Sequence, residues 1–414
     1  MEIFEKVIDT VNFVISQSEF YKNMYGNNLN TIKEFKKLPY TDSNLLLKNK
    51  NDILTSDDQN CYIFTTGGSS GNTKTVYLNF SELHDNIKKH GESYKRAGIK
   101  KSDRVATFGL PGVLTSEFTV YLALEESGCF ILPIGESGDY FKIYNMIQDY
   151  NINTLLLMPT DIVSFINFLK ENNLPLIIPK IITGGEALQN STKQFIIDNL
   201  STKLFGATYQ SMDFGTLGYQ NETLESNQYI VGNQDLYLEI VNESNVSSEI
   251  GTGELVVTNC KRKLLPVIRY RTGDYVTLNF NRFGQQILTV HNRISNIPKI
   301  AGEKFESSII SKYLENNSLY TGRYQYNVDR INEKDTISLK IETINSFFDE
   351  QDEKKKILDF LYFEIPKLEK QIQNHMVNPI KIFLGLENEL NFQVSNSTGK
   401  IINLQDERTK NENK

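Results

Sequence analysis

Apolar side chains recur every three or four residues near the start of the chain, at Phe4, Val7, Val11 and Val14. This spacing places them on one face of an α-helix. The sequence therefore predicts a helix over residues 4–15 that packs against a core.

A different pattern follows between residues 104 and 183, where short apolar runs alternate with amphipathic stretches. The runs at 104–108, 129–134, 154–158 and 179–183 are predicted strands, and the stretches at 115–127, 140–150 and 161–171 are predicted helices. Such alternation indicates crossover units and a mostly parallel sheet with helices on its faces.

The pattern changes again towards the C-terminus. Residues 229–241 and 253–259 are rich in β-branched side chains between turn formers, which favours antiparallel strands. After about residue 295 a strand at 336–343 and a charged amphipathic helix at 349–373 are expected. We predict an α/β protein with a large domain over residues 1–294, mostly parallel with an antiparallel or barrel-like portion, and a small α+β domain over residues 295–414.

The composition is that of a soluble globular protein, with 39% hydrophobic and 23% charged residues. A net charge of -7 argues against a nucleic-acid partner bound through bulk positive charge. Three scattered cysteines and four histidines without metal or triad spacing suggest no disulfide framework or zinc site, and a reducing cytoplasm is expected. The N-terminus lacks a signal-peptide pattern and no apolar run approaches the ~20 residues that cross a bilayer, so no membrane partner is expected.

Residues 66–74 read TGGSSGNTK and follow a strand-like run at 61–64. Glycines let backbone N–H groups approach a polyanion, while hydroxyls and an ammonium group add donors for phosphate oxygens. The loop is not a Walker A loop, because two residues separate Gly71 from Lys74. By itself it is equally compatible with a flexible polar turn, and as a phosphate loop its simplest ligand is ATP. The candidate residues are Thr66, Gly67, Gly68, Ser69, Ser70, Gly71, Thr73 and Lys74.

Three further motifs carry candidate chemistry. In the run YRTGD at 270–274, Asp274 follows a glycine turn and suits ribose hydroxyls, although an Asp in a hairpin turn is common. Tyr209 is an aromatic residue that suits stacking on a purine, and it lies four residues before Asp213, a candidate Mg²⁺ ligand. Near the C-terminus, Lys400 follows a glycine, where a solvated surface lysine is the usual interpretation.

In this order the motifs resemble the signatures of the adenylate-forming superfamily of acyl-CoA synthetases, peptide-synthetase adenylation domains and luciferases. The loop matches that family's pattern except at Gly67 and Thr73, and the run at 270–274 matches at every position. Residues 184–187, 253–258 and 265–272 look most like the phenylacetate–CoA ligase branch.

The resemblance implies an enzyme that activates a carboxylic acid with ATP and Mg²⁺ to an acyl-adenylate, releasing pyrophosphate. The acyl group then passes to the thiol of CoA or of the phosphopantetheine of an acyl or peptidyl carrier protein. The domain at 295–414 is implied to be a mobile lid that carries a catalytic lysine, Lys400. Acceptors of another kind, an amine or a protein, stay open, as does a non-catalytic nucleotide-binding protein. The presence of Lys74, Asp274 and Lys400 argues against the non-catalytic alternative.

The resemblance also implies individual roles. Tyr209 would pack on adenine, Asp274 would bind the ribose, and Lys400 would offset the charge that builds up between carboxylate and α-phosphate. Asp213 would hold the metal, although the family usually has Glu there, and Ser295 would be the hinge, where Asp or Lys is usual. The remaining expected ATP contacts are Gly184, Gly185, Glu186, Thr208 and Arg293.

The acyl pocket is implied by position alone. Its aromatic and small side chains would suit an aryl or modest aliphatic acid, but the same residues also fit an ordinary core with turns. The set is Phe108, Gly109, Pro111, Gly135, Ala207, Ser211 and Phe214.

Overall fold

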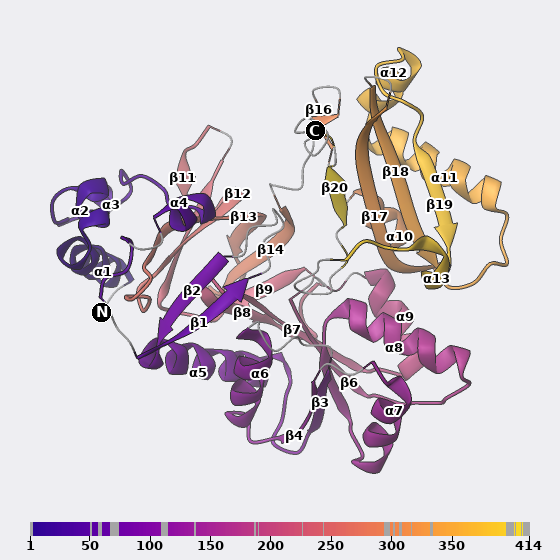
Figure 1. Cartoon of the computed structure of the whole chain (residues 1–414), viewed down its shortest axis with the longest axis horizontal. Helices are drawn as coiled ribbons and strands as arrows, with labels where there is room; N and C mark the ends of the chain where they lie inside the picture. Colours follow the sequence, from indigo (N-terminus) through magenta and orange to yellow (C-terminus); the bar gives the residue numbers. More distant parts are fainter. Residues whose placement is uncertain are drawn as a thin grey trace. The chain divides into compact units, whose positions relative to one another are not determined.

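The computed structural model shows two compact units, each assembled from separate stretches of the chain (Figure 1). Unit 1 comprises Met1–Met158, Ile177–Ala187 and Thr202–His291, and unit 2 comprises Pro159–Leu176, Leu188–Ser201 and Asn292–Lys414. The predicted division at residues 294 and 295, with its assignment of roles, stays a prediction. The structure describes residues 3–49, 52–56, 60–66, 74–108, 115–135, 138–185, 188, 190–225, 227–242, 244–293, 299–300, 303–305, 309–315, 317–331, 334–394, 401, 403–406 and 408.

The described residues of unit 1 form a 12-stranded sheet whose order is β11-β10-β12-β13-β14-β9-β8-β7-β6-β5-β3-β4. Strands β3 to β7 are parallel, which confirms the α/β fold class predicted from the alternating pattern. Helices lie between them in sequence, as the crossovers of a parallel sheet require. The elements are β3 (Arg104–Phe108), α6 (Thr115–Glu125), β4 (Phe130–Gly135), α7 (Tyr140–Asp149), β5 (Thr154–Leu157), α8 (Pro159–Glu171), β6 (Lys180–Gly184), α9 (Asn190–Leu200) and β7 (Leu204–Ser211).

The other half of the sheet is antiparallel, as the β-rich segments predicted. Residues 229–241 form two strands, and these are not neighbours, because β9 pairs with β8 and β14 whereas β10 pairs with β11 and β12. The strands are β8 (Gly215–Gln220), β9 (Gln228–Val231), β10 (Leu236–Val241), β11 (Ser247–Ser248), β12 (Gly251–Asn259), β13 (Val267–Phe280) and β14 (Gln286–Arg293).

The N-terminal helices pack on this antiparallel half through one apolar core. Val7, Val11 and Val14 are fully buried there, which confirms the predicted inward face of the first helix. A hairpin of β1 and β2 leads into the long helix α5, whose N-cap is Asn79 in a capping box with Glu82. The elements are α1 (Ile3–Gln17), α2 (Glu19–Tyr25), α3 (Ile32–Phe35), α4 (Ser43–Lys48), β1 (Cys61–Thr66), β2 (Lys74–Asn79) and α5 (Phe80–Ala97).

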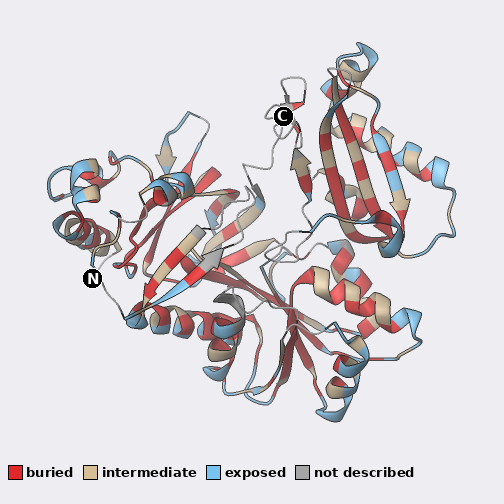
Figure 2. Cartoon of the chain, in the orientation of Figure 1, coloured by how far each residue is buried: buried red, intermediate tan, exposed pale blue. Residues whose placement is uncertain are grey.

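Unit 2 contains a second sheet of order β19-β18-β17-β20 with its own apolar core. Its long strands β17 and β18 are mostly buried with intermediate positions between, whereas helix α11 presents both buried and exposed residues (Figure 2). The predicted helix at 349–373 is two helices, because Pro366 begins a new helix and Ile365 before it leaves the helical region, with φ −128° and ψ 70°. The elements are β15 (Lys299–Ile300), β16 (Glu303–Lys304), α10 (Ile309–Leu314), β17 (Tyr320–Ile331), β18 (Lys334–Thr343), α11 (Glu350–Glu364), α12 (Pro366–Gln373), β19 (Lys381–Gly385), α13 (Glu387–Leu390) and β20 (Leu404–Asp406).

Helices α8 and α9 contact this C-terminal sheet through polar groups. The Thr192 hydroxyl of α9 donates to the carbonyl oxygen of Thr321 at 2.9 Å. The Asn167 amide of α8 donates to Glu342 and Glu387 at 3.0 Å each, and Arg323 forms ion pairs with both of these carboxylates. Segments more than 120 residues apart in sequence are therefore built into one unit.

Candidate active site

The predicted phosphate loop connects two antiparallel strands. Thr66, the last residue of β1, pairs in register with Lys74, the first residue of β2, so the base of the loop is closed by the hairpin. Residues 67–73 and the side chains of Thr66 and Lys74 lie outside the described part, and their phosphate-binding role stays a prediction.

The carboxyl ends of β6 and β7 lie side by side, because Gly184 pairs with Thr208. A Cβ at Gly184 would come 3.6 Å from the Thr208 hydroxyl, and Gly185 has a left-handed backbone with φ 79°. The hydroxyls of Thr183 and Thr208 are buried and have no hydrogen-bond partner among the described residues. Parallel sheets bind ligands at this end of their strands, so polar groups are available where the resemblance places the adenine. Glu186 lies outside the described residues.

The structure brings together two predicted site residues that are 65 positions apart. The Tyr209 hydroxyl donates to Asp274 Oδ2 at 2.6 Å, joining β7 to β13. The Tyr209 ring lies 5.4 Å from that of Tyr229 and 6.0 Å from that of Phe214, measured between centroids. An aromatic surface and a carboxylate thus meet at one point, and both groups suit the parts of a nucleoside.

The YRTGD motif lies at a β-bulge of β13 and is held by its own polar side chains and by Glu254 of β12. Gly273 has φ 76°, a conformation that favours glycine, and its N–H donates to Glu254 at 3.2 Å. The Thr272 hydroxyl accepts from the N–H of Asp274 at 3.0 Å, and Arg271 donates to Glu254 at 2.7 Å. These contacts fix the backbone that presents the Asp274 carboxylate.

Asp213, the predicted metal ligand, lies next to the same motif. The Tyr270 hydroxyl donates to Asp213 Oδ2 at 2.7 Å. Arg262 donates to the carbonyl oxygen of Met212 at 2.6 Å. Burial lowers the pKa of the Arg262 guanidinium to about 10, and the nearby carboxylates of Glu82 and Asp213 partly oppose this shift. Among the described residues no group of three or more His, Cys, Asp or Glu side chains forms a metal cluster. A Mg²⁺ ion that accompanies ATP needs only one or two carboxylates, so the Asp213 side chain fits such a role.

The described members of the predicted acyl pocket are mostly core residues. Phe108 pairs with Gly135 at the ends of β3 and β4, and Phe108, Ala207 and Phe214 are each at most 2% exposed. The Ser211 hydroxyl accepts from the N–H of Asp213 at 3.2 Å. The pocket stays a prediction, and Gly109 and Pro111 lie outside the described residues.

The predicted residues of the hinge and lid are mostly outside the described part. Arg293 is the last residue of β14, and its side chain is not described; Ser295 and Lys400 are not described either. Val394 and Ile401, which flank Lys400 in the sequence, form an antiparallel bridge. Their predicted functions are untested.

The sequence patterns did not predict the residues that contact the strand β13, which carries the YRTGD motif. Arg269 has φ 46°, is 2% exposed, forms a buried ion pair with Glu239 at 2.8 Å, and donates to the carbonyl oxygens of Lys36 and Leu38. Thr41 also pairs with Tyr270. Lys36, Leu38 and Thr41 lie more than 220 residues before their partners in β13, and Glu239 lies 30 residues before Arg269, so no local pattern in the sequence signals these contacts.

A family model for AMP-binding enzymes matches residues 9–261. The chain belongs to the AMP-binding enzyme family. The matched region includes the loop at 66–74, Tyr209 and Asp213, and it ends before the YRTGD motif. The family assignment confirms the resemblance to adenylate-forming enzymes.

Several curated proteins are similar to this AMP-binding enzyme. The indoleacetate–lysine synthetase of Pseudomonas savastanoi is 26% identical over 235 residues, and the match spans 55% of this chain and about half, 56%, of the synthetase. The phenylacetate–coenzyme A ligase of Pseudomonas putida is 21% identical over 93% of this chain and 87% of the ligase. That of Aromatoleum evansii is 20% identical over 78% of this chain and 75% of the ligase.

A solved structure shares the fold of this AMP-binding enzyme. A 2-hydroxyisobutyryl-CoA ligase in complex with its acyl-AMP superposes with a TM-score of 0.76 at 15% sequence identity, over 99% of this chain and 90% of the ligase. The match to ATP-bound MatB from Rhodopseudomonas palustris is less extensive, with a TM-score of 0.59 at 14% sequence identity over 85% of this chain and 67% of MatB. At these identities the likeness supports the fold alone.

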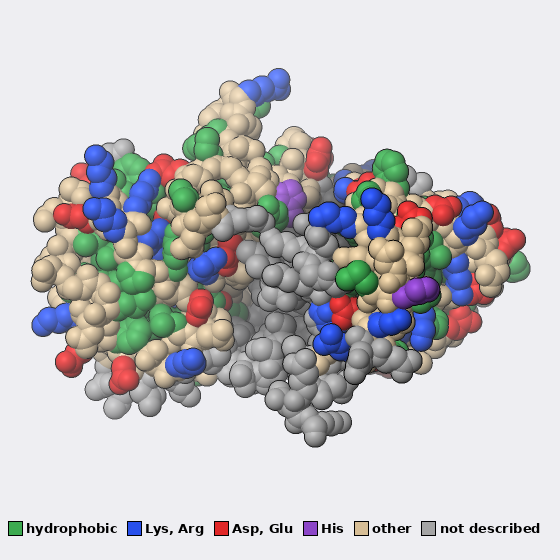
Figure 3. Space-filling view, turned by 90° about the horizontal axis from the view of Figure 1, so that it is seen from above, with side chains coloured by type: hydrophobic (Ala, Val, Ile, Leu, Met, Phe, Trp, Pro, Cys, Tyr) green, Lys and Arg blue, Asp and Glu red, His purple; other side chains and the backbone are tan. Residues whose placement is uncertain are grey.

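The surface of this AMP-binding enzyme carries both signs of charge. Basic and acidic side chains are interspersed among the described residues on the face seen in Figure 3. Among the described helices, none combines the length and apolar character needed to span a membrane.

Proposed function

We propose that this AMP-binding enzyme activates a carboxylic acid with ATP, releasing pyrophosphate, and transfers the acyl group of the acyl-adenylate to the thiol of CoA. The observation that carries the proposal is the hydrogen bond between Tyr209 and Asp274, which brings an aromatic ring near the end of β7 together with a carboxylate of β13. Membership of the AMP-binding family supports ATP as the ligand of this pair.

The roles of the chain's own residues follow from charge and geometry. Asp274 accepts hydrogen bonds from ribose hydroxyls, and the Tyr209 hydroxyl holds that carboxylate in place. The loop from Thr66 to Lys74 holds the distal phosphates, and Lys400 offsets the negative charge where the substrate carboxylate meets the α-phosphate. Asp213 supplies a carboxylate to Mg²⁺, which neutralises phosphate charge when bound.

Similarity to two phenylacetate–CoA ligases favours an aryl acid as substrate and CoA as acceptor. An amine acceptor is a second candidate, because a synthetase that joins indoleacetate to lysine is also similar. A carrier-protein thiol could take the place of CoA as the acceptor. We also propose that the enzyme acts in the cytoplasm and in a biosynthetic pathway.

The first experiment is carboxylate-dependent exchange of pyrophosphate into ATP across aryl, fatty and amino acids. We expect exchange with one class, and no exchange with any acid would contradict the proposal. Release of AMP is then compared with CoA, a phosphopantetheinylated carrier protein and lysine as acceptors. Stimulation by lysine alone would refute the thioester step and support the amine alternative.

A further inference from the structure

Unit 1 has a cavity of about 180 Å³ between helix α5 and the strand β8, with the turn after β9 as its third wall. We call it the α5 cavity. None of its lining residues belongs to the predicted ATP, metal or acyl-binding sets. Its polar and aromatic lining consists of Lys88, Lys89, Arg96, Thr216, Tyr219 and Asn233, together with Glu92 and Ser93.

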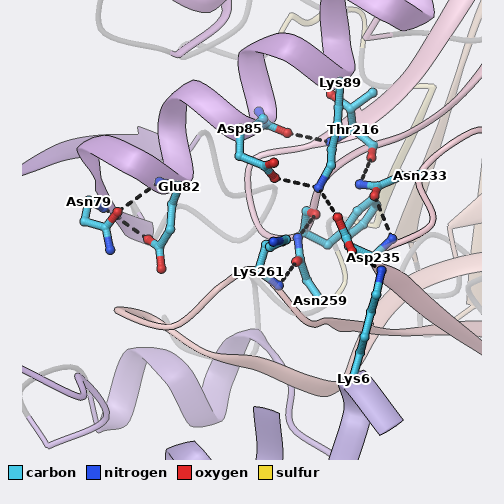
Figure 4. Close-up of polar contacts among 12 residues, drawn as sticks. Lys6, Asn79, Glu82, Asp85, Lys89, Thr216, Asn233, Asp235, Asn259 and Lys261 are labelled. Atoms are coloured by element: carbon cyan, nitrogen blue, oxygen red, sulfur yellow. Dashed lines mark hydrogen bonds and ion pairs between the residues drawn. The ribbon is translucent and has the colours of Figure 1, made fainter. Parts of the chain in front are cut away.

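The charges of the α5 cavity do not balance. Lys89 pairs with Asp85 at 2.5 Å and with Asp235 at 2.7 Å, and Asp235 also pairs with Lys6 at 2.6 Å (Figure 4). This group of two lysines and two aspartates is neutral. A separate pair, Glu92 with Lys95 at 3.0 Å, is neutral as well.

Two cations remain after these pairs are set aside. Within the described part of the chain, neither Lys88 nor Arg96 forms an ion pair, and both side chains are exposed at the cavity mouth. Arg96 lies with its guanidinium carbon 5.6 Å from the centroid of the Tyr219 ring, which leaves its N–H donors available. The cavity therefore carries an excess of two positive charges in a protein whose net charge is -7.

The wall opposite helix α5 is held by a hydrogen-bonded frame. The Asn233 amide donates to the carbonyl oxygen of Thr216 at 2.8 Å and accepts from the N–H of Asp235 at 3.0 Å (Figure 4). Asn86 of α5 accepts from the N–H of Thr216 at 2.9 Å, which ties the helix to the strand. Thr216 is 1% exposed, and its hydroxyl has no hydrogen-bond partner among the described residues. Hydrogen bonds thus connect the walls of the cavity, and its lining includes a polar group without a partner among the described residues.

We propose that the α5 cavity binds a phosphate group. Lys88 and Arg96 lie on one helix face, and the carboxylate between them, Glu92, is paired with Lys95. Ammonium and guanidinium groups without an ion-pair partner are donors that recognise phosphate oxygens. The volume of about 180 Å³ admits a phosphoryl group. Two sources share this chemistry: free inorganic phosphate or pyrophosphate, and the phosphate of a larger nucleotide that extends out of the mouth.

The test is isothermal titration of the full-length protein with inorganic phosphate, pyrophosphate and adenosine 3′,5′-bisphosphate. Wild type is compared with a double variant, Lys88→Gln and Arg96→Gln, which removes the two unpaired charges from exposed positions of the helix. The matched control, Lys100→Gln and Lys101→Gln, removes two exposed charges just beyond the same helix. Because the predicted ATP loop also attracts phosphate, the difference between the variants is the readout.

We expect the cavity variant to lose one binding event or to weaken it about tenfold, and the control to bind as wild type does. An effect with inorganic phosphate or pyrophosphate identifies a free anion as the ligand, whereas an effect with the bisphosphate alone identifies the larger nucleotide. Equal binding by all three proteins would overturn the proposal. An equal loss in variant and control would also overturn it, because it would reflect general charge. Failure of the proposed acyl-CoA ligase activity would leave this result unaffected.

Discussion

His90 is a base held neutral inside unit 1, and we expect it to make the free energy of unfolding depend on pH. The residue is fully buried in helix α5, and its two ring nitrogens have no hydrogen-bond partner among the described residues. Its ring lies 4.2 Å from that of Tyr94, measured between centroids. Burial lowers the pKa of His90 from 6.5 to about 3.

The sign and size of the effect follow from proton linkage. Between about pH 6.5 and pH 3 the unfolded chain binds a proton at position 90 and the folded chain does not. The free energy of unfolding therefore does not depend on His90 above pH 6.5. Below that value it falls by about 1.4 kcal/mol per pH unit. At pH 5 the loss amounts to about 2 kcal/mol.

The assay compares urea unfolding at pH 7.5 and pH 5 for wild type, His90→Phe and His84→Gln. The phenylalanine keeps a ring against Tyr94 but cannot titrate, so its stability should fall by about 2 kcal/mol less than that of wild type between the two pH values. His84 lies on the same helix and is exposed, so its substitution should leave the wild-type pH dependence intact. Equal losses in wild type and His90→Phe would refute the reasoning.

A second measurement reads the pKa itself. The chain has four histidines, so their side-chain ¹⁵N resonances are separable. We expect the resonance of His90 to stay constant down to pH 4, and the substitution His90→Phe identifies it. A His90 resonance that titrates near pH 6.5 in the folded protein would contradict the lowered pKa.

Three further predictions concern the site and its sheet. Tyr209→Phe removes the donor to Asp274 and should raise the KM for ATP about tenfold in the exchange assay, whereas Tyr229→Phe should not. Gly206→Ala would place a Cβ 2.2 Å from a backbone oxygen and should destabilise by about 1–3 kcal/mol in urea unfolding, whereas Gly138→Ala, with open space around it, should be neutral. Lys400→Ala should retain ATP binding but lose about 10² or more of exchange activity; unchanged exchange would exclude it from the mechanism.

Local patterns in the sequence predicted much of the fold. The alternation of apolar runs and amphipathic stretches predicted the parallel strands, because each crossover unit is encoded within a short window. The prediction of one helix at 349–373 was wrong. The apolar periodicity continues across Pro366, but the helical backbone is interrupted there. The segment at 229–241 was likewise divided, because pairing partners lie outside the window that a pattern describes.

The candidate site was predictable as a set of residues but not as an arrangement. Motifs named Tyr209 and Asp274 separately, and their hydrogen bond depends on which strands are neighbours in the sheet. The contacts of Arg269 and Thr41 could not be predicted, because a buried ion pair and a strand bridge between distant segments produce no regular spacing in the sequence. The excess positive charge of Lys88 and Arg96 could not be inferred from the sequence, because the same helix also carries the ion pairs Asp85–Lys89 and Glu92–Lys95.

The discontinuity of unit 2 has a consequence for how the chain folds. Helices α8 and α9 are synthesised before residue 201, but their polar partners, such as Thr321 and Glu342, follow more than 100 residues later. Closing loops of that length costs chain entropy before the contacts form, which slows folding. We therefore expect these two helices to present uncovered polar surfaces on the growing chain, and unit 2 to be the last part of the protein to become protected from proteolysis during refolding.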